Sequence, residues 1–142
     1  KNNLTLIEYA AFFGSIKIFT YLINNKVELN PSLWLYAIHS NNPEIIAFLE
    51  EKEVSMPFET CLKEAIKCHH NDIAYYIIQQ FDLDNNIICK DCFNYYNYEF
   101  FQDDFNRDQI IEAAIQYDLI SLFDVLYNQK EINLQSKIIS FN

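Results

Sequence analysis

The sequence predicts an all-α fold in which short helix–turn–helix repeats stack as a solenoid, and three observations support this fold class. First, the chain of 142 residues contains 1 glycine and 3 prolines but 51% hydrophobic residues, which disfavours all-β folds because tight β-turns need glycine. Second, one pattern of apolar residues recurs in the segments 9–22, 36–49, 64–77 and 113–126. Third, the spacing within each segment fits two short helices joined by a turn. A single helix pair cannot bury its apolar face alone, so we expect the pairs to stack.

Each segment is arranged around an alanine, namely Ala10, Ala37, Ala65 or Ala114. Residues three and four positions before the alanine, and eight, nine and twelve positions after it, are apolar or small. The first two positions share a helical face with the alanine, and the last three share a face of a second helix. We therefore expect both faces to be buried, with the small alanine allowing close approach of neighbouring helices.

The turn between the two helices is predicted four residues after each alanine. That position holds Gly14, Asn41, His69 and Asp118, which are the residue types that best tolerate the left-handed conformation found at many helix ends. The second helix is predicted to begin at Ser15, at Asn42-Pro43-Glu44 and at the polar stretch 70–72.

The first helix of each pair is predicted to begin five residues before the alanine. This position holds Thr5, Ser32, Thr60 and Gln109, and Thr5 together with Glu8 fits a capping box.

We predict a single domain over residues 1–142. Pro31 and Pro57 mark the starts of the second and third repeats, which gives repeats at about 4–30, 31–56, 57–84 and 107–134. Residues 85–106 are expected to form a degenerate repeat or an ordered insertion, and residues 135–142 a further helix or a cap. The chain does not begin with methionine and is expected to be a segment of a longer protein, or a chain whose beginning is missing.

The composition also restricts the partners. A formal net charge of -10 repels phosphate backbones, so no nucleic acid is expected. No apolar run approaches the ~18 residues of a membrane span, and no secretory signal is visible. We therefore expect no membrane association, a cytoplasmic location and reduced thiols at Cys61, Cys68, Cys89 and Cys92.

A group of cysteines and histidines is a candidate metal or redox site: Cys61, Cys68, His69, His70, Cys89 and Cys92. Zinc needs about four converging ligands, but Cys61, His69 and His70 occupy positions that are Leu6, Gly14 and Ser15 in the first repeat. We therefore expect no metal and no cofactor. No glycine-flanked nucleophile is possible and no catalytic base stands out, so we also expect no enzyme. A zinc-stabilised or redox-active domain that uses Cys89 and Cys92 remains the alternative.

The first repeat resembles an ankyrin repeat. Its residues 5–14, TLIEYAAFFG, follow the frame Thr-Pro-Leu-His-x-Ala-Ala-x-x-Gly, with matches at Thr5, Ile7, Ala10, Ala11 and Gly14. Together the repeats are similar to a divergent ankyrin-repeat family of unknown function that is expanded in parasitic protozoa. Offsets of 27 and 28 residues are shorter than the usual length of about 33, so the β-hairpin fingers of that family are expected to be reduced to short loops.

This resemblance implies a scaffold that binds another protein along the concave face of its inner helices. The residues expected on that face are Tyr9, Phe12, Phe13, Tyr36, His39, Ser40, Lys67, Cys68, Gln116 and Tyr117. Two alternatives remain open: Phe12 or Phe13 packs against a preceding repeat, or the segment is a structural scaffold with no binding role. The aromatic and acidic stretch 93–105 is expected to pack against the end of the stack rather than to bind a basic partner.

Overall fold

The computed structural model describes residues 4–81, 91–100 and 107–128, and within these ranges the regular structure is helical, with no β-strand. This confirms the all-α prediction at the level of secondary structure. None of the helices in these ranges is long and apolar enough to cross a membrane. The chain divides into two compact units, Lys1–Leu83 and Asp84–Asn142, which are described separately. The predicted single domain over residues 1–142 stays a prediction.

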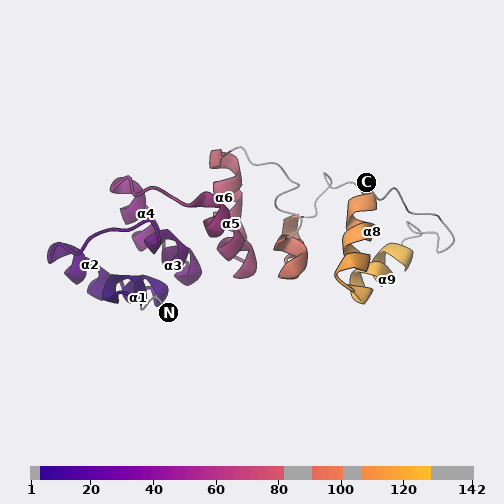
Figure 1. Cartoon of the computed structure of the whole chain (residues 1–142), viewed down its shortest axis with the longest axis horizontal. Coiled ribbons are helices and arrows are strands. Elements are labelled where there is room, and N and C mark those ends of the chain that lie inside the picture. The colour runs from indigo at the N-terminus through magenta and orange to yellow at the C-terminus, as the bar shows by residue number, and fades with distance from the viewer. Residues whose placement is uncertain (1–3, 82–90, 101–106, 129–142) are drawn as a thin grey trace. The chain divides into compact units, whose positions relative to one another are not determined.

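The first unit contains three helix pairs (Figure 1). The pairs are α1 (Leu6–Phe12) with α2 (Ile16–Asn24), α3 (Leu33–Ser40) with α4 (Pro43–Glu51), and α5 (Phe58–Lys67) with α6 (Asn71–Phe81). Within each pair the two helices pack together, and the first helices also pack in a row, α1 on α3 and α3 on α5. We call α1, α3 and α5 the inner helices.

The core of this unit follows the predicted pattern around the alanines. Ala10, Ala37 and Ala65 are buried, and so are the residues three positions before them, Ile7, Trp34 and Leu62. Trp34 also donates a hydrogen bond from Nε1 to the carbonyl of Val54 at 2.8 Å, which ties α3 to the segment that leads into α5.

The predicted burial is wrong for two residues of the first pair. Leu6 is 77% exposed and Ile18 is 57% exposed, whereas their equivalents Leu33 and Ile45 are completely buried. The reason is that α3 and α4 pack against the first helix pair, while within residues 4–81 no helix pair precedes α1.

The predicted turns are confirmed. The backbone angle φ is 62° at Gly14, 52° at Asn41 and 57° at His69. After α1, Ser15 N–H donates to the Ala10 carbonyl at 2.8 Å and Gly14 N–H donates to the Ala11 carbonyl at 3.0 Å. This is the Schellman arrangement, in which a left-handed residue closes the last carbonyls of a helix. The same pair of bonds ends α5.

Two of the predicted helix starts are confirmed in detail. Thr5 and Glu8 form the capping box of α1, with Thr5 N–H donating to Glu8 Oε2 at 2.8 Å. Asn42 accepts hydrogen bonds from the N–H groups of Glu44 and Ile45 at the start of α4. The amide of Asn42 also donates to the carbonyl of Gly14 at 3.1 Å, so this cap joins the first two helix pairs.

Other predicted starts are wrong or only partly right. Thr60 lies inside α5, which begins at Phe58 directly after its N-cap residue Pro57. Gln109 likewise lies inside α8, which begins at Arg107. Ser15 and Ser32 are at the predicted N-cap positions without a capping bond from the side chain; Ser32 Oγ donates instead to Glu8 Oε1 at 2.7 Å.

The second unit contains a helical turn at residues 91–94, the 3-10 helix η1 (Tyr98–Phe100), α8 (Arg107–Gln116) and α9 (Ile120–Asn128). Helices α8 and α9 pack together as the fourth predicted pair, and the turn between them has φ 54° at Asp118, as predicted. Phe93 packs with Ala113, Ala114 and Leu119 in one buried cluster.

Residues 91–97 end in the same way as an inner helix. Cys92 is completely buried, and Asn97 N–H donates to its carbonyl at 2.9 Å. Tyr96 has φ 55° and donates its N–H to the carbonyl of Phe93. Cys92 therefore stands where the other repeats have alanine, which supports the degenerate-repeat interpretation for this part of 85–106. The rest of that range, apart from 91–100, and residues 135–142 lie outside the described residues.

Replacing Gly14 tests the turn. A Cβ at this position would meet Asn42 Nδ2 at 3.4 Å, which leaves room for it, so the cost comes from the left-handed backbone. We expect Gly14→Ala to lower the free energy of unfolding by roughly 1–2 kcal/mol, measured by urea denaturation followed by circular dichroism. Gly14→Asn is the control and should cost less, because asparagine tolerates this conformation at Asn41. Equal stability of Gly14→Ala and the wild type would contradict the assigned turn.

The Glu8 carboxylate predicts a dependence of stability on pH. Burial alone raises the pKa of Glu8, but hydrogen bonds from Thr5 N–H and from the Ser32 and Thr5 hydroxyls outweigh it and lower the pKa below the ordinary 4.5. A carboxyl group whose pKa falls on folding stabilises the fold above its unfolded pKa, and this contribution is lost as the pH falls through the folded pKa. Glu8→Gln should therefore flatten the stability profile below pH 4.5, whereas Glu28→Gln, an exposed control, should not.

Candidate functional site

An aromatic row crosses the inner helices α1 and α3. The ring centroids of Tyr9 and Phe13 are 4.9 Å apart, and those of Phe13 and Phe12 are 5.0 Å apart. Phe12 stacks on the ring of His39 at 4.2 Å with an interplanar angle of 13°, and Tyr36 lies 6.4 Å from Phe12. We call these five residues the aromatic row.

Part of this row faces solvent. Tyr9 is 54% exposed and Phe13 is 60% exposed, while Phe12, Tyr36 and His39 are half-buried. Large exposed aromatic side chains of this kind are enriched in protein-binding hot spots.

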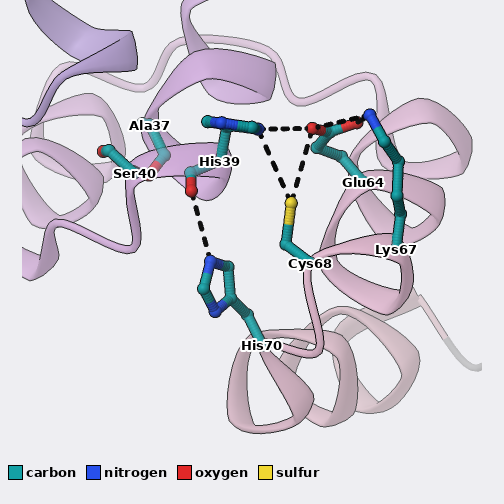
Figure 2. A network of polar contacts seen from close by, with 7 residues as sticks. All are labelled: Ala37, His39, Ser40, Glu64, Lys67, Cys68 and His70. Atoms are coloured by element: carbon teal, nitrogen blue, oxygen red, sulfur yellow. Dashed lines mark hydrogen bonds and ion pairs between the residues drawn. The ribbon is translucent and has the colours of Figure 1, made fainter. Parts of the chain in front are cut away.

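The row continues at His39 into a group of polar side chains, which we call the polar cluster: His39, Glu64, Lys67 and Cys68 (Figure 2). His39 Nδ1 lies 2.7 Å from Glu64 Oε1 and 3.5 Å from Cys68 Sγ. The Cys68 thiol donates to Glu64 Oε1 at 3.6 Å, and Lys67 Nζ lies 3.2 Å from Glu64 Oε2. The cluster thus joins α3 to the last turns of α5.

Helical geometry explains this meeting. Glu64, Lys67 and Cys68 are three and four residues apart and therefore share one face of α5. His39 reaches them from α3 because its ring is stacked on Phe12, and because His70 Nε2 lies 3.2 Å from the His39 carbonyl oxygen. Both the ring and the backbone of His39 are held by neighbours.

The electrostatics of the cluster favour an ionised glutamate and a protonated thiol. Burial raises the pKa of Glu64, but hydrogen bonds from His39 and Lys67 outweigh it and lower the pKa overall. Burial, followed by the charge of Glu64, raises the pKa of the Cys68 thiol. The neighbouring Cys61 is completely buried, which raises its pKa to about 12.

This geometry differs from that of a catalytic triad. A cysteine–histidine–carboxylate triad uses both ring nitrogens, one toward the nucleophile and one toward the acid. Here Nδ1 of His39 makes the contacts with both Glu64 and Cys68. The thiol pKa is also raised rather than lowered, so Cys68 is not set up as an activated nucleophile.

The structure brings together most of the predicted site residues. Tyr9, Phe12, Phe13, Tyr36 and His39 form the aromatic row, and Lys67 and Cys68 join the polar cluster. Ser40 is half-buried and donates to the carbonyl of Ala37 on its own helix. Gln116 and Tyr117 lie in the second unit, where Gln116 is exposed and Tyr117 stacks on Phe93.

Glu64 was not among the residues predicted for the site. This residue lies one position before Ala65, just as Tyr9 and Tyr36 lie one position before their alanines. The repeat pattern that selected the two tyrosines also identifies this position, but a glutamate there is not distinguished by residue type from an ordinary surface carboxylate. Of the cysteines in the alternative site, Cys92 is completely buried and Cys89 lies outside the described residues.

A hollow of about 290 Å³, away from the aromatic row and the polar cluster, lies between α4 and α6. Apolar side chains such as Ile46, Ile73 and Trp34 line much of it, and Tyr76 Oη donates to Glu50 Oε1 at 2.7 Å between the two helices. Among the described residues its lining also includes the carboxylates of Glu50 and Asp72, but no lysine, histidine or cysteine.

Comparison with protein families gives one match. A family model described as Domain of unknown function (DUF3447) matches residues 26–104, more than half of the chain. The match includes α3 to α6, and therefore the whole polar cluster. No curated protein and no solved structure matches the chain.

The reactivity of Cys68 tests the electrostatics of the polar cluster. Because Glu64 raises the thiol pKa, Glu64→Gln should lower that pKa and speed alkylation of Cys68 at neutral pH, by about tenfold for each unit of pKa. Rates would be measured with iodoacetamide and peptide mass spectrometry. Glu59→Gln, an exposed change on the same helix, is the control. Slower alkylation in Glu64→Gln would instead indicate that Glu64 and His39 activate the thiol.

Proposed function

The chain belongs to the family described as Domain of unknown function (DUF3447), and since this description assigns no activity, we propose its role from the inner helices: recognition of another protein, without catalysis. The partner binds along the exposed faces of α1, α3 and α5. The observation that carries the proposal is the aromatic row, which exposes Tyr9 and Phe13 and leads directly into the charged groups of the polar cluster.

The chemistry of this surface suits a protein partner. Exposed rings supply apolar contact area, and Glu64 and Lys67 at the end of the row supply directional polar contacts. A net charge of -10 disfavours nucleic acid. The partner's interface should therefore combine an apolar patch with polar groups, rather than a run of phosphates.

We further propose that the helix pairs are divergent ankyrin repeats stacked as a solenoid. Support comes from the resemblance of residues 5–14 to the ankyrin frame, from the recurring left-handed turns and from the row formed by the inner helices. In such a scaffold the inner helices supply a binding surface while the repeats keep their own core.

A second candidate role is packing against another helix pair. The exposure of Leu6 and Ile18 favours it, because their equivalents Leu33 and Ile45 are buried by the preceding pair. Another helix pair would therefore contact Leu6 and Ile18. Substitutions at these two residues can distinguish such a contact from a partner bound to the aromatic row.

Affinity capture with substituted baits tests the proposal. We expect Phe13→Ser and Tyr9→Ser to weaken capture of a specific protein by about tenfold or more, as for a hot-spot residue. Tyr21→Ser is the matched control, because Tyr21 is 66% exposed but lies on α2. Capture would be quantified by mass spectrometry from extracts of the source cells, after circular dichroism has verified folding of each variant.

The pattern of losses distinguishes the two roles. Loss with Phe13→Ser and retention with Tyr21→Ser supports binding by the aromatic row. Retention with Phe13→Ser and Tyr9→Ser contradicts it. If capture is lost with Leu6→Ser and Ile18→Ser but not with Phe13→Ser or Tyr9→Ser, the captured protein packs against α1 and α2 as another helix pair would.

A further inference from the structure

We propose that His39, Glu64 and Cys68 form a binding site for a divalent transition metal, with Zn²⁺ as the best-matched ion. The three potential ligand atoms, one from each side chain, all lie within 4.8 Å of one another. They come from two successive helix pairs, so the metal would link α3 to α5.

The distances within the cluster fit a tetrahedral site. With Zn–S near 2.3 Å and Zn–N or Zn–O near 2.0–2.1 Å, a sulfur and a nitrogen or oxygen bound to the same tetrahedral zinc lie about 3.5–3.6 Å apart. Cys68 Sγ lies 3.5 Å from His39 Nδ1 and 3.6 Å from Glu64 Oε1. Two of the three distances between the ligand atoms, from sulfur to nitrogen and from sulfur to oxygen, therefore already match a bound zinc.

The third distance, between the nitrogen and oxygen ligand atoms, would increase when the metal binds. His39 Nδ1 and Glu64 Oε1 are 2.7 Å apart, whereas two light-atom ligands of a tetrahedral zinc lie about 3.3 Å apart. The metal would thus replace this hydrogen bond, and the two atoms would separate by about 0.6 Å. The Glu64 side chain is 14% exposed and that of His39 is 34% exposed, so neither ligand is sealed from solvent.

The ligand types select among metals. A thiolate, an imidazole and a carboxylate together suit zinc, whereas magnesium and calcium prefer sites made of oxygen atoms alone. Thiolate and carboxylate would balance the two positive charges of the ion. Three protein ligands leave a fourth position for water or for a ligand of another molecule.

The surroundings of the three ligands support their orientation. Phe12 stacks on the His39 ring, and His70 Nε2 contacts the His39 carbonyl oxygen, so the ring and the backbone of His39 are both held by neighbours. Lys67 is the competing group, because its Nζ lies 3.2 Å from Glu64 Oε2. The Lys67 side chain is 47% exposed, so its ammonium has room to move toward solvent when the metal takes the carboxylate.

This site shares Cys68 with the group of cysteines and histidines in the sequence but does not use Cys89 or Cys92, and it departs from the expectation of no metal. The departure has a simple cause. His39 is 25 residues before Glu64 in the chain, and only the packing of α3 on α5 brings the two together.

Metal titration of the purified chain tests the inference. We expect one Zn²⁺ per chain in competition with a chromophoric chelator, and with Co²⁺ a thiolate-to-metal charge-transfer absorption. Cys68→Ser should abolish that absorption, and Cys68→Ser, His39→Gln and Glu64→Gln should each weaken Zn²⁺ binding by about tenfold or more. Circular dichroism would verify that each variant stays folded.

The chain offers matched controls. Cys92→Ala installs the residue that the other repeats have at this position, and His69→Asn installs the residue of the Asn41 turn; neither should change Zn²⁺ affinity. Absence of stoichiometric binding, or binding unchanged in Cys68→Ser, would overturn the proposal. Loss of Zn²⁺ binding in Cys92→Ala would also overturn the proposal, and would indicate a site that uses Cys89 and Cys92 instead. Phe13→Ser should leave Zn²⁺ binding intact, so the metal site and the protein-binding role can fail separately.

Discussion

The left-handed turn that ends each inner helix is the constraint on which the rest of the structure depends. After α1 and α5 two N–H groups close onto carbonyls of the preceding helical turn, one of them the carbonyl of buried Ala10 or Ala65, and after α3 the Asn41 N–H donates to the Ile38 carbonyl. This geometry sets where one helix stops relative to its alanine. Phe12 and His39, each two residues after an alanine, consequently hold equivalent places on α1 and α3, and their rings stack. The site is thus a consequence of how the helices end.

Features with a local cause could be predicted from the sequence. The turns at Gly14 and Asn41 and the caps at Thr5 and Asn42 depend on residues within a few positions of one another, and the structure has them as predicted. The left-handed residues Lys26 and Glu53 after α2 and α4 were not foreseen, because neither side chain favours that conformation. The backbone there is set by the need to close the helix carbonyls and lead the chain into the next pair.

Features that depend on neighbouring repeats could not be predicted from a single repeat. Leu6 and Leu33 occupy the same helical position, yet one is 77% exposed and the other completely buried. The register of the degenerate repeat within 85–106 was not predicted for a related reason: cysteine replaces alanine at Cys92, and Tyr96 adopts the left-handed turn without being a residue type that prefers it. Where the core is packed and the two backbone hydrogen bonds at the helix end are formed, the position of the turn residue matters more than its residue type.

The variation of the exposed positions explains how one backbone carries different chemistry along α1, α3 and α5. The position before the alanine is Tyr9, then Tyr36, then Glu64, and the position three after it is Phe13, then Ser40, then Cys68. The alanine and the residue three before it stay small or apolar, and buried, in all three helices. The surface can therefore change from aromatic to polar along the three helices without a change in the core, because the two sets of positions lie on different faces of the same helix. A fold built in this way keeps its buried core in one set of residues and varies its surface chemistry in the other.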